Sequence, residues 1–256
     1  MLENANKDLQ NIKIIRYTVT DSTNTRAREY AEKHSIDAPV VFIADGQTSG
    51  RGRRGRSFDS QTDAGLYISF LYKPKTQSLD VSKITAFAAV KVCRVLSRCA
   101  GADVGIKWVN DIYHNGKKLC GILTEGEFSL NGKGFDYVIC GIGINIRKRK
   151  FSEELSEIAT TLEDATGESV DKELLASELI AEFFSSSDTS ELIREYKARS
   201  VLIGNDVEVH AISGEIYSAR VIDISENAGL VVQTADGEVK ELISAEVSVR
   251  KKSFSI

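Results

Sequence analysis

The stretch "DVGIKWVNDIYHNGKKLCGILTEGEF" (residues 103–128) predicts a strand, a tight turn and a second strand. Asn115-Gly116 is a strong signal for a two-residue hairpin turn between such strands. A turn at 131–134 and a buried strand up to residue 146 follow it. Strands joined by short turns run antiparallel, so the stretch predicts an antiparallel meander. It favours an α+β fold with a mixed or antiparallel sheet over the βαβ alternation of a doubly wound fold.

Further strands and helices are predicted on either side of this hairpin. The strands are expected at 39–46 and 64–73, and the helices at 20–34, 80–101, 152–167, 171–184 and 190–200. From Val201 on, short β runs separated by glycines predict a small C-terminal barrel. We therefore expect two domains, at residues 1–200 and 201–256.

The composition is that of a globular protein, with 42% hydrophobic and 27% charged residues among 256. A net charge of −4 argues against a dedicated nucleic-acid-binding protein, because these are usually basic. The N-terminus lacks the apolar run of a signal peptide, and no stretch approaches the roughly 20 apolar residues of a membrane span. Four cysteines without C-x-x-C spacing indicate reduced thiols, so we expect a cytoplasmic protein.

Four arginines and three glycines make up the run "GRGRRGR" between Gly50 and Arg56. Glycines let backbone N–H groups approach an oxyanion, and guanidinium groups bind carboxylates and phosphates with forked donors. The run lacks the spacing of a P-loop or a Rossmann turn. Three interpretations stay open on these residues alone: an anion-binding loop, a solvated charge run and an RNA-binding tract.

Two other stretches carry polar residues beside buried strands. Lys118 enters the apolar segment "LCGIL", where a lysine tends to be paired with an anion or to extend its amine to solvent. Alternation places Lys107 and Val109 on one face and Trp108 and Asn110 on the other, with core packing as the expected role of Trp108. In "GIGIN" (residues 141–145), alternating glycines leave room for a ligand or another backbone.

Taken together and in this order, the motifs resemble those of biotin protein ligases. The corresponding segments are "DSTN" (21–24), "GRGRRGR" (50–56), "KWVNDIYHNGKKLCGILTE" (107–125) and "GIGIN" (141–145). The resemblance implies a core like that of class II aminoacyl-tRNA synthetases and an SH3-like C-terminal barrel. It also implies that biotin and ATP, with Mg²⁺, form biotinyl-5′-AMP. The biotinyl group then passes to a lysine of a biotin carboxyl carrier domain.

The resemblance also assigns roles to individual residues. The catalytic residues would be Lys118, Arg53 and Asp111, with Asp111 a candidate base. Biotin would be bound by Ser22, Thr23, Asn24, Gln47, Arg51, Gly52, Arg53, Lys118, Gly121 and Gly141. The nucleotide would be bound by Arg51, Phe58, Asn110 and Asn145.

Two residues depart from the pattern of the family. Phe58 stands where many members have a tryptophan that covers the adenine, and Val109 replaces a proline. Phe58 keeps a stacking face but loses the indole N–H. "GRGRRGR" would act as a mobile lid over the reactive adenylate.

The remaining expectations concern partners. Only 21 residues precede Ser22, so we expect no N-terminal DNA-binding domain and no DNA partner. We expect no membrane partner, and a monomer or a homodimer. A lipoate protein ligase, which shares the core but lacks the "GRGRRGR" run, is the nearest alternative enzyme.

Overall fold

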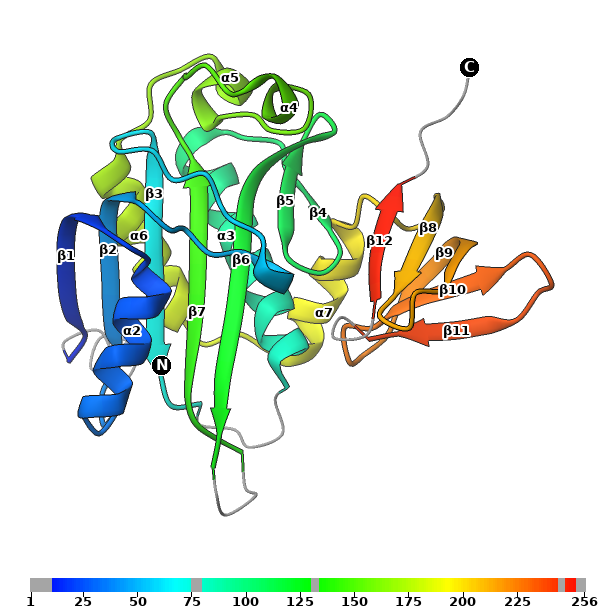
Figure 1. Cartoon of the computed structure of the whole chain (residues 1–256), viewed down its shortest axis with the longest axis horizontal. Helices are drawn as coiled ribbons and strands as arrows, with labels where there is room; N and C mark the ends of the chain where they lie inside the picture. Colours follow the sequence, from blue (N-terminus) through cyan, green and yellow to red (C-terminus); the bar gives the residue numbers. More distant parts are fainter. Residues whose placement is uncertain (1–10, 75–79, 130–133, 244–246, 252–256) are drawn as a thin grey trace.

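A computed structural model describes residues 11–74, 80–129, 134–243 and 247–251 of the chain. Its larger part is built on a seven-stranded sheet with the order β1-β2-β3-β7-β6-β5-β4 (Figure 1). The strands are β1 (Lys13–Thr20), β2 (Val40–Gln47), β3 (Gly65–Tyr72), β4 (Gly105–Lys107), β5 (Asp111–His114), β6 (Lys117–Phe128) and β7 (Phe135–Asn145). The β1–β2 pair is parallel and the other pairs are antiparallel. The expected α+β class and mixed sheet are confirmed.

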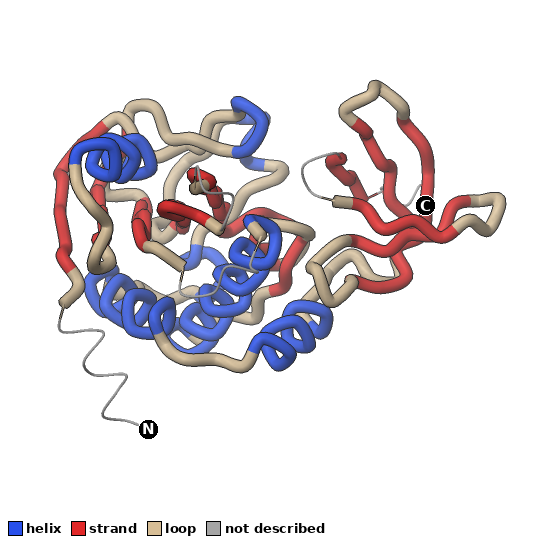
Figure 2. Tube along the Cα trace, turned by 90° about the horizontal axis from the view of Figure 1, so that it is seen from below, coloured by secondary structure: helices blue, strands red, loops and turns tan. Residues whose placement is uncertain are grey.

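Helices pack against both faces of this sheet, which explains why its central strands are almost wholly apolar. Helix α2 (Thr23–Lys33) contacts β2, β3 and β7 on one face. On the other face lie α3 (Val81–Ala100), α6 (Lys172–Phe184) and α7 (Thr189–Ala198), grouped on one side of the strands in Figure 2. The main core fills the space between this helical layer and the sheet.

The long helix α3 has clear start and stop signals. The carboxylate of Asp80 accepts a hydrogen bond from the Lys83 N–H at its beginning. Gly101 ends it in the left-handed conformation, with φ of 62°. Between them the apolar positions recur at helical spacing, and their side chains are buried.

The C-terminal part is a separate five-stranded antiparallel sheet with the order β11-β10-β9-β8-β12. Its strands are β8 (Asp206–Ala211), β9 (Ile216–Ile224), β10 (Leu230–Thr234), β11 (Val239–Leu242) and β12 (Val247–Lys251). One face is buried through alternating residues such as Val207, Val209 and Val221. The small C-terminal β domain is thus confirmed, while its boundary at residue 200 stays a prediction.

The sequence missed three local features. Strand β1 was not expected; with α2 and β2 it forms one βαβ unit at the start of the fold. The helix predicted at 152–167 is instead two short helices, α4 (Glu153–Ser156) and α5 (Leu162–Thr166). Strand β4 ends at Lys107, so the alternation predicted through Val109 is wrong. Most of the turn expected at 131–134 lies outside the described residues.

Candidate active site

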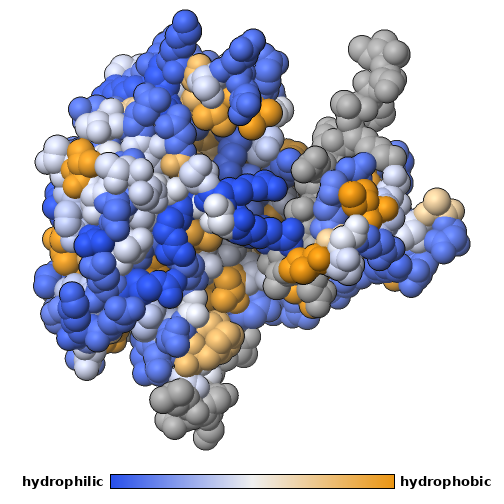
Figure 3. Space-filling view, viewed as in Figure 1, coloured by the Kyte–Doolittle hydropathy of each residue, from blue (hydrophilic) through white to orange (hydrophobic). Residues whose placement is uncertain are grey.

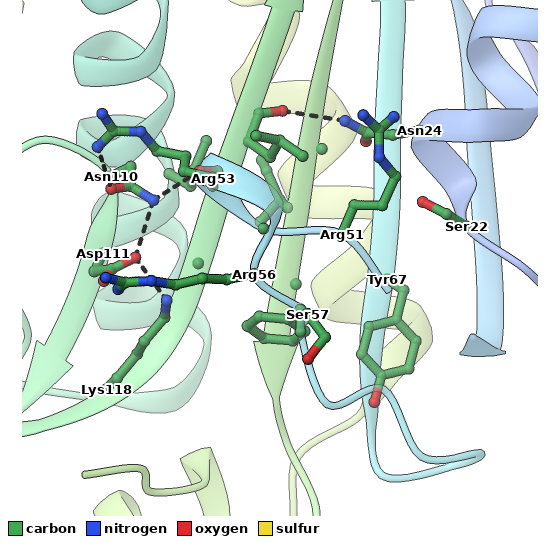
Figure 4. A pocket seen from close by; sticks show the side chains of 18 of the residues that line it. Ser22, Asn24, Arg51, Arg53, Arg56, Ser57, Tyr67, Asn110, Asp111 and Lys118 are labelled. Atoms are coloured by element: carbon green, nitrogen blue, oxygen red, sulfur yellow. Dashed lines mark hydrogen bonds and ion pairs between the residues drawn. The ribbon is translucent and has the colours of Figure 1, made fainter. Parts of the chain in front are cut away.

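A single cavity on the α2 side of the large sheet holds nearly all the predicted site residues (Figure 4). The 50–58 loop covers part of it, and the strands β6 and β7 form its floor. Strongly hydrophilic residues gather in the middle of this molecular face, between the two sheets (Figure 3). The predicted residues that line the cavity are Ser22, Thr23, Asn24, Gln47, Arg51, Gly52, Arg53, Phe58, Asn110, Asp111, Lys118, Gly121 and Gly141.

Glycines give the cavity its floor. Gly143 of β7 pairs with Gly121 of β6, and Gly141 pairs with Leu123. A Cβ at Gly141 would lie 1.9 Å from Oδ1 of Asn24, and one at Gly143 would lie 2.6 Å from the Phe58 ring. The alternating glycines of "GIGIN" therefore admit side chains from α2 and the loop onto the sheet, as the sequence suggested.

Buried hydroxyl and amide groups form one end of the cavity. Oε1 of Gln47 accepts hydrogen bonds from the backbone N–H (2.8 Å) and the hydroxyl (3.2 Å) of Thr23. The Gln47 amide donates to Oγ of Ser60 at 2.9 Å. The Ser69 hydroxyl lies 2.7 Å from Oγ1 of Thr23 and 2.6 Å from Oδ1 of Asn24. This end suits a neutral ligand rich in donors and acceptors.

Charged groups form the other end. Nζ of Lys118 lies 2.7 Å from Oδ1 of Asp111, so the expected pairing of this lysine with an anion is confirmed. The Asn110 amide donates to the same carboxylate oxygen at 3.0 Å and to the Ile122 carbonyl at 2.9 Å. Arg53 donates to Oδ1 of Asn110 at 3.1 Å, which joins the loop to this end.

The segment between α4 and α5 holds the backbone of Lys118. The Lys118 N–H donates to the Ile158 carbonyl at 2.8 Å, and the Thr160 N–H donates to the Lys118 carbonyl at 2.9 Å. This pairing with β6 explains why residues 158–160 leave the helical pattern. It also fixes the point from which the lysine side chain enters the cavity.

The arginine-glycine loop folds back on itself as a tight hairpin. The Gly52 N–H donates to the Arg56 carbonyl at 2.7 Å, and the Phe58 N–H donates to the Gly50 carbonyl at 2.8 Å. Arg54 at its tip has a positive φ of 56°. The side chain of Arg53 is the most buried of the four arginines, and burial lowers its pKa, although an arginine keeps its charge.

The ring of Phe58 lies within the cavity over the glycine floor. It approaches Gly143 and Gly121, and Nζ of Lys118 lies 5.7 Å from the ring centroid. Tyr67 meets it edge-on, with 6.4 Å between the centroids. The ring thus offers a flat apolar surface beside the charged end, which suits stacking against a base.

Asn145 is the one predicted site residue that does not line the cavity. Its amide donates to the Thr160 carbonyl at 3.2 Å, and its Oδ1 accepts from Arg149 at 3.3 Å. Arg149 is itself paired with Asp59 at 2.7 Å. A role of Asn145 toward the nucleotide stays a prediction, and its contacts here are structural.

Sequence reasoning overlooked the roles of two residues around the site and one contact of a third. Ser69, fully buried, is a hydroxyl in an otherwise apolar strand, which was a usable signal. Glu125 closes the quoted 107–125 motif and binds Arg51, but it received no role. Trp108 is buried as predicted and also donates from Nε1 to the Ala228 carbonyl of the C-terminal part at 2.8 Å. That last contact joins parts 120 residues apart, which no local pattern reveals.

The described residues contain no cluster of three or more His, Cys, Asp or Glu side chains that could hold a metal ion. None of the helices in the described ranges is long and apolar enough to cross a membrane. The charged and amide side chains that line the cavity include its arginines, Lys107, Lys118, Asn110 and Asp111.

Two family comparisons match most of the chain. The sequence model of the biotin/lipoate A/B protein ligase family matches residues 17–145, and that of the biotin protein ligase C terminal domain matches residues 203–250. The bifunctional ligase/repressor BirA of Bacillus subtilis is 30% identical over 244 residues, covering 92% of this chain and 74% of that protein. The biotin–[acetyl-CoA-carboxylase] ligase of Mycobacterium tuberculosis is 30% identical over 215 residues, with coverages of 80% and 77%.

Solved structures agree with these relatives. The biotin protein ligase of Aquifex aeolicus in complex with biotin and ATP superposes with a TM-score of 0.80 and 29% identity, covering 94% of this chain and 99% of that one. The expected synthetase-like ligase core with a C-terminal β domain is therefore confirmed. The chain belongs to the biotin/lipoate A/B protein ligase family and, within it, to the biotin protein ligases.

Proposed function

We propose that the chain joins biotin to ATP to form biotinyl-5′-AMP. It then transfers the biotinyl group to a lysine of a biotin carboxyl carrier protein. One observation carries this proposal beyond family membership: a single cavity has a neutral hydrogen-bonding end at Thr23 and Gln47 and a cationic end at Lys118 and Arg53. Biotin has a polar ureido head, an apolar body and a carboxylate tail, which match these ends and the glycine floor between them.

In the first step, a carboxylate oxygen of biotin attacks the α-phosphorus of ATP. A P–O bond forms, the bond to the β-phosphate oxygen breaks, and pyrophosphate leaves with the electron pair. Both reactants are anions, so bringing them together requires positive charge close to the reacting atoms. Lys118 and Arg53 supply it from opposite sides of Asn110 and Asp111.

ATP enters this scheme as its magnesium complex. Magnesium is commonly held by one or two carboxylates together with substrate phosphates rather than by a cage of side chains. The donor set of the cavity fits that mode, because Asp111 is a carboxylate beside the cationic end. The ion would share the triphosphate charge there, while Lys118 and Arg53 orient the carboxylate and the phosphates.

In the second step, the amine of the carrier lysine attacks the acyl carbon of the adenylate. A C–N bond forms, the C–O bond to AMP breaks, and the amine loses a proton to a base. Asp111 is our proposal for that base, since its carboxylate lies beside Lys118 in the cavity. No covalent enzyme intermediate is needed, so the chemistry requires no nucleophilic side chain.

Ligand-dependent ATP–pyrophosphate exchange tests the activation step. Exchange with biotin and not with lipoate supports the proposal, and exchange with lipoate alone would make the chain a lipoate ligase. The RNA-binding interpretation of the arginine loop predicts salt-sensitive RNA affinity and no exchange. It has lost support because Arg51 and Arg53 bind Glu125 and Asn110 within the protein.

We further propose that the reaction takes place in the cytoplasm, where ATP is available and free thiols stay reduced. All four cysteines are free, and three of them are buried. The lack of DNA binding and the state as monomer or homodimer stay predictions. A DNA-binding assay and a sedimentation measurement, respectively, test them.

A further inference from the structure

Glu125 of β6 is the carboxylate at which the arginine loop and helix α2 meet, at the rim of the cavity. Its side chain is 17% exposed. Oε1 and Oε2 accept two parallel hydrogen bonds from Arg51, at 2.8 and 3.1 Å. Oε1 also accepts from Arg28 at 2.7 Å, and Oε2 accepts from the Asn24 amide at 2.9 Å. One carboxylate thus binds two arginines and an asparagine that come from α2 and from the loop.

The forked contact fixes the orientation of Arg51 without exhausting its donors. A guanidinium group has five N–H donors, and the pair to Glu125 uses two of them. Three donors are left for an anionic ligand in the cavity that Arg51 lines. Planar forked pairs restrict geometry more strongly than single contacts do, so the remaining donors point in a defined direction.

The same carboxylate sets the orientation of the Asn24 amide. Its Nδ2 donates to the Leu123 carbonyl at 3.3 Å and to Glu125 at 2.9 Å. Because the Asn24 amide nitrogen donates to these two acceptors, its Oδ1 faces the hydroxyl of Ser69, which lies 2.6 Å away. Glu125 therefore controls a group at the neutral end of the cavity as well as one in the loop.

Charge balance keeps this arrangement compatible with an anionic ligand. Two arginines face one carboxylate, so the cluster keeps a net positive charge. Arg28 still neutralises Glu125 when Arg51 shares its charge with a ligand. A lone Glu125–Arg51 pair would instead cancel the charge that the cavity needs.

We propose that Glu125 is a positioning residue for the activation step. It orients Arg51 toward the biotin carboxylate and the phosphates, and it orients Asn24 toward biotin. This inference rests on the proposed function. Glu125 acts through these two side chains and contacts no reacting atom. It gives a role to the glutamate that ends the 107–125 motif.

The test measures biotin-dependent ATP–pyrophosphate exchange for Glu125→Gln. We expect kcat/KM for biotin to fall about tenfold or more, because a neutral amide cannot accept from both nitrogens of Arg51. Glu127→Gln makes the same chemical change two residues along the strand at an exposed position, and it should exchange like the wild type. A melting temperature close to that of the wild type shows that the variant folds. If Glu125→Gln has a lower melting temperature than the wild type, the same exchange measurement is made with Glu125→Asp. That variant keeps the charge and shortens the side chain.

A double-mutant cycle with Arg51→Gln separates positioning from mere structure. If Glu125 acts largely through Arg51, the double variant loses clearly less than the product of the two single losses. A double-variant loss equal to the product of the two single losses would overturn the inference while the proposed function stands. A Glu125→Gln variant with normal exchange would do the same. A folded wild type without biotin-dependent exchange would overturn both.

Discussion

Nζ of Lys118 lies 2.7 Å from Oδ1 of Asp111, on the neighbouring strand of the same hairpin. The pairing satisfies a lysine that enters an apolar strand, and it places one cation and one carboxylate inside the cavity. A ligand carboxylate or phosphate can share this lysine with Asp111. Substitutions of Lys118 therefore test chiefly the activation step, and substitutions of Asp111 test chiefly the transfer step.

Lys118→Gln should reduce biotin-dependent ATP–pyrophosphate exchange about 10- to 100-fold, because a charge-assisted bond to the reacting anions is lost. The melting temperature should change little, since a partly exposed ion pair contributes about 0–1 kcal/mol to stability. Lys117→Gln is the matched control. Its amine donates to the Ser156 carbonyl away from the cavity. Equal exchange by both variants would remove Lys118 from the mechanism.

Asp111→Asn should affect the two steps differently. Exchange needs no acceptor amine, so it should fall only through the loss of the carboxylate beside Lys118 and magnesium, and by clearly less than transfer falls. Biotinyl transfer from preformed adenylate to a carrier domain should fall about 100-fold, as expected when a general base is lost. Single-turnover transfer rates measure this directly. An equal loss in both steps would show that Asp111 organises the site and does not take the proton.

Two of the floor glycines, Gly141 and Gly143, should have different effects when replaced by alanine. At Gly141 the new Cβ would meet Oδ1 of Asn24 at 1.9 Å, so Gly141→Ala should raise KM for biotin. At Gly143 it would meet the Phe58 ring at 2.6 Å, so Gly143→Ala should mainly raise KM for ATP. Steady-state exchange kinetics with each substrate varied in turn distinguish them. The same KM pattern for both variants would contradict the assignment of Phe58 to the nucleotide.

Stability should fall in alkaline solution because of buried thiols. Burial raises the pKa of Cys93 and of Cys140 from 9.0 to about 12. In the unfolded chain these thiols ionise near pH 9, whereas in the folded chain they stay protonated, so the folded state binds more protons above that pH. The free energy of unfolding should then drop by about 1.4 kcal/mol per pH unit for each thiol between about pH 9 and 12.

Urea unfolding under reducing conditions at about pH 7.5, 9 and 10 checks this slope. Cys140→Ala should show a shallower decline than the wild type, because one of the linked groups is gone. Parallel declines in the two proteins would exclude Cys140 as a source of the effect.

The hairpin and the helices were predictable because their signals are local. Asn115-Gly116 sets the turn between β5 and β6, and Asp80 and Gly101 delimit α3. Strand β1 escaped prediction because it is an edge strand with many exposed positions, and its parallel pairing with β2 is a tertiary contact. The break between α4 and α5 likewise depends on Lys118, some 40 residues away in the chain.

The site was predictable where residue type carries the chemistry, as for Lys118 and the arginine loop. The orientation of these groups was not. Arg51 was expected to face anions directly, yet two of its guanidinium N–H groups donate to the carboxylate of Glu125. Asn145 was expected at the nucleotide end, yet it binds Thr160 and Arg149 outside the cavity lining. Such partners are chosen by tertiary packing, which sequence spacing does not encode.

The most direct test of the central claim is the mass of a carrier domain after incubation with the protein, biotin and MgATP. We predict the gain of one biotinyl group per carrier, dependent on ATP and on the carrier's acceptor lysine. An unchanged carrier mass alongside active folded protein, or a gain with lipoate in place of biotin, would contradict the account.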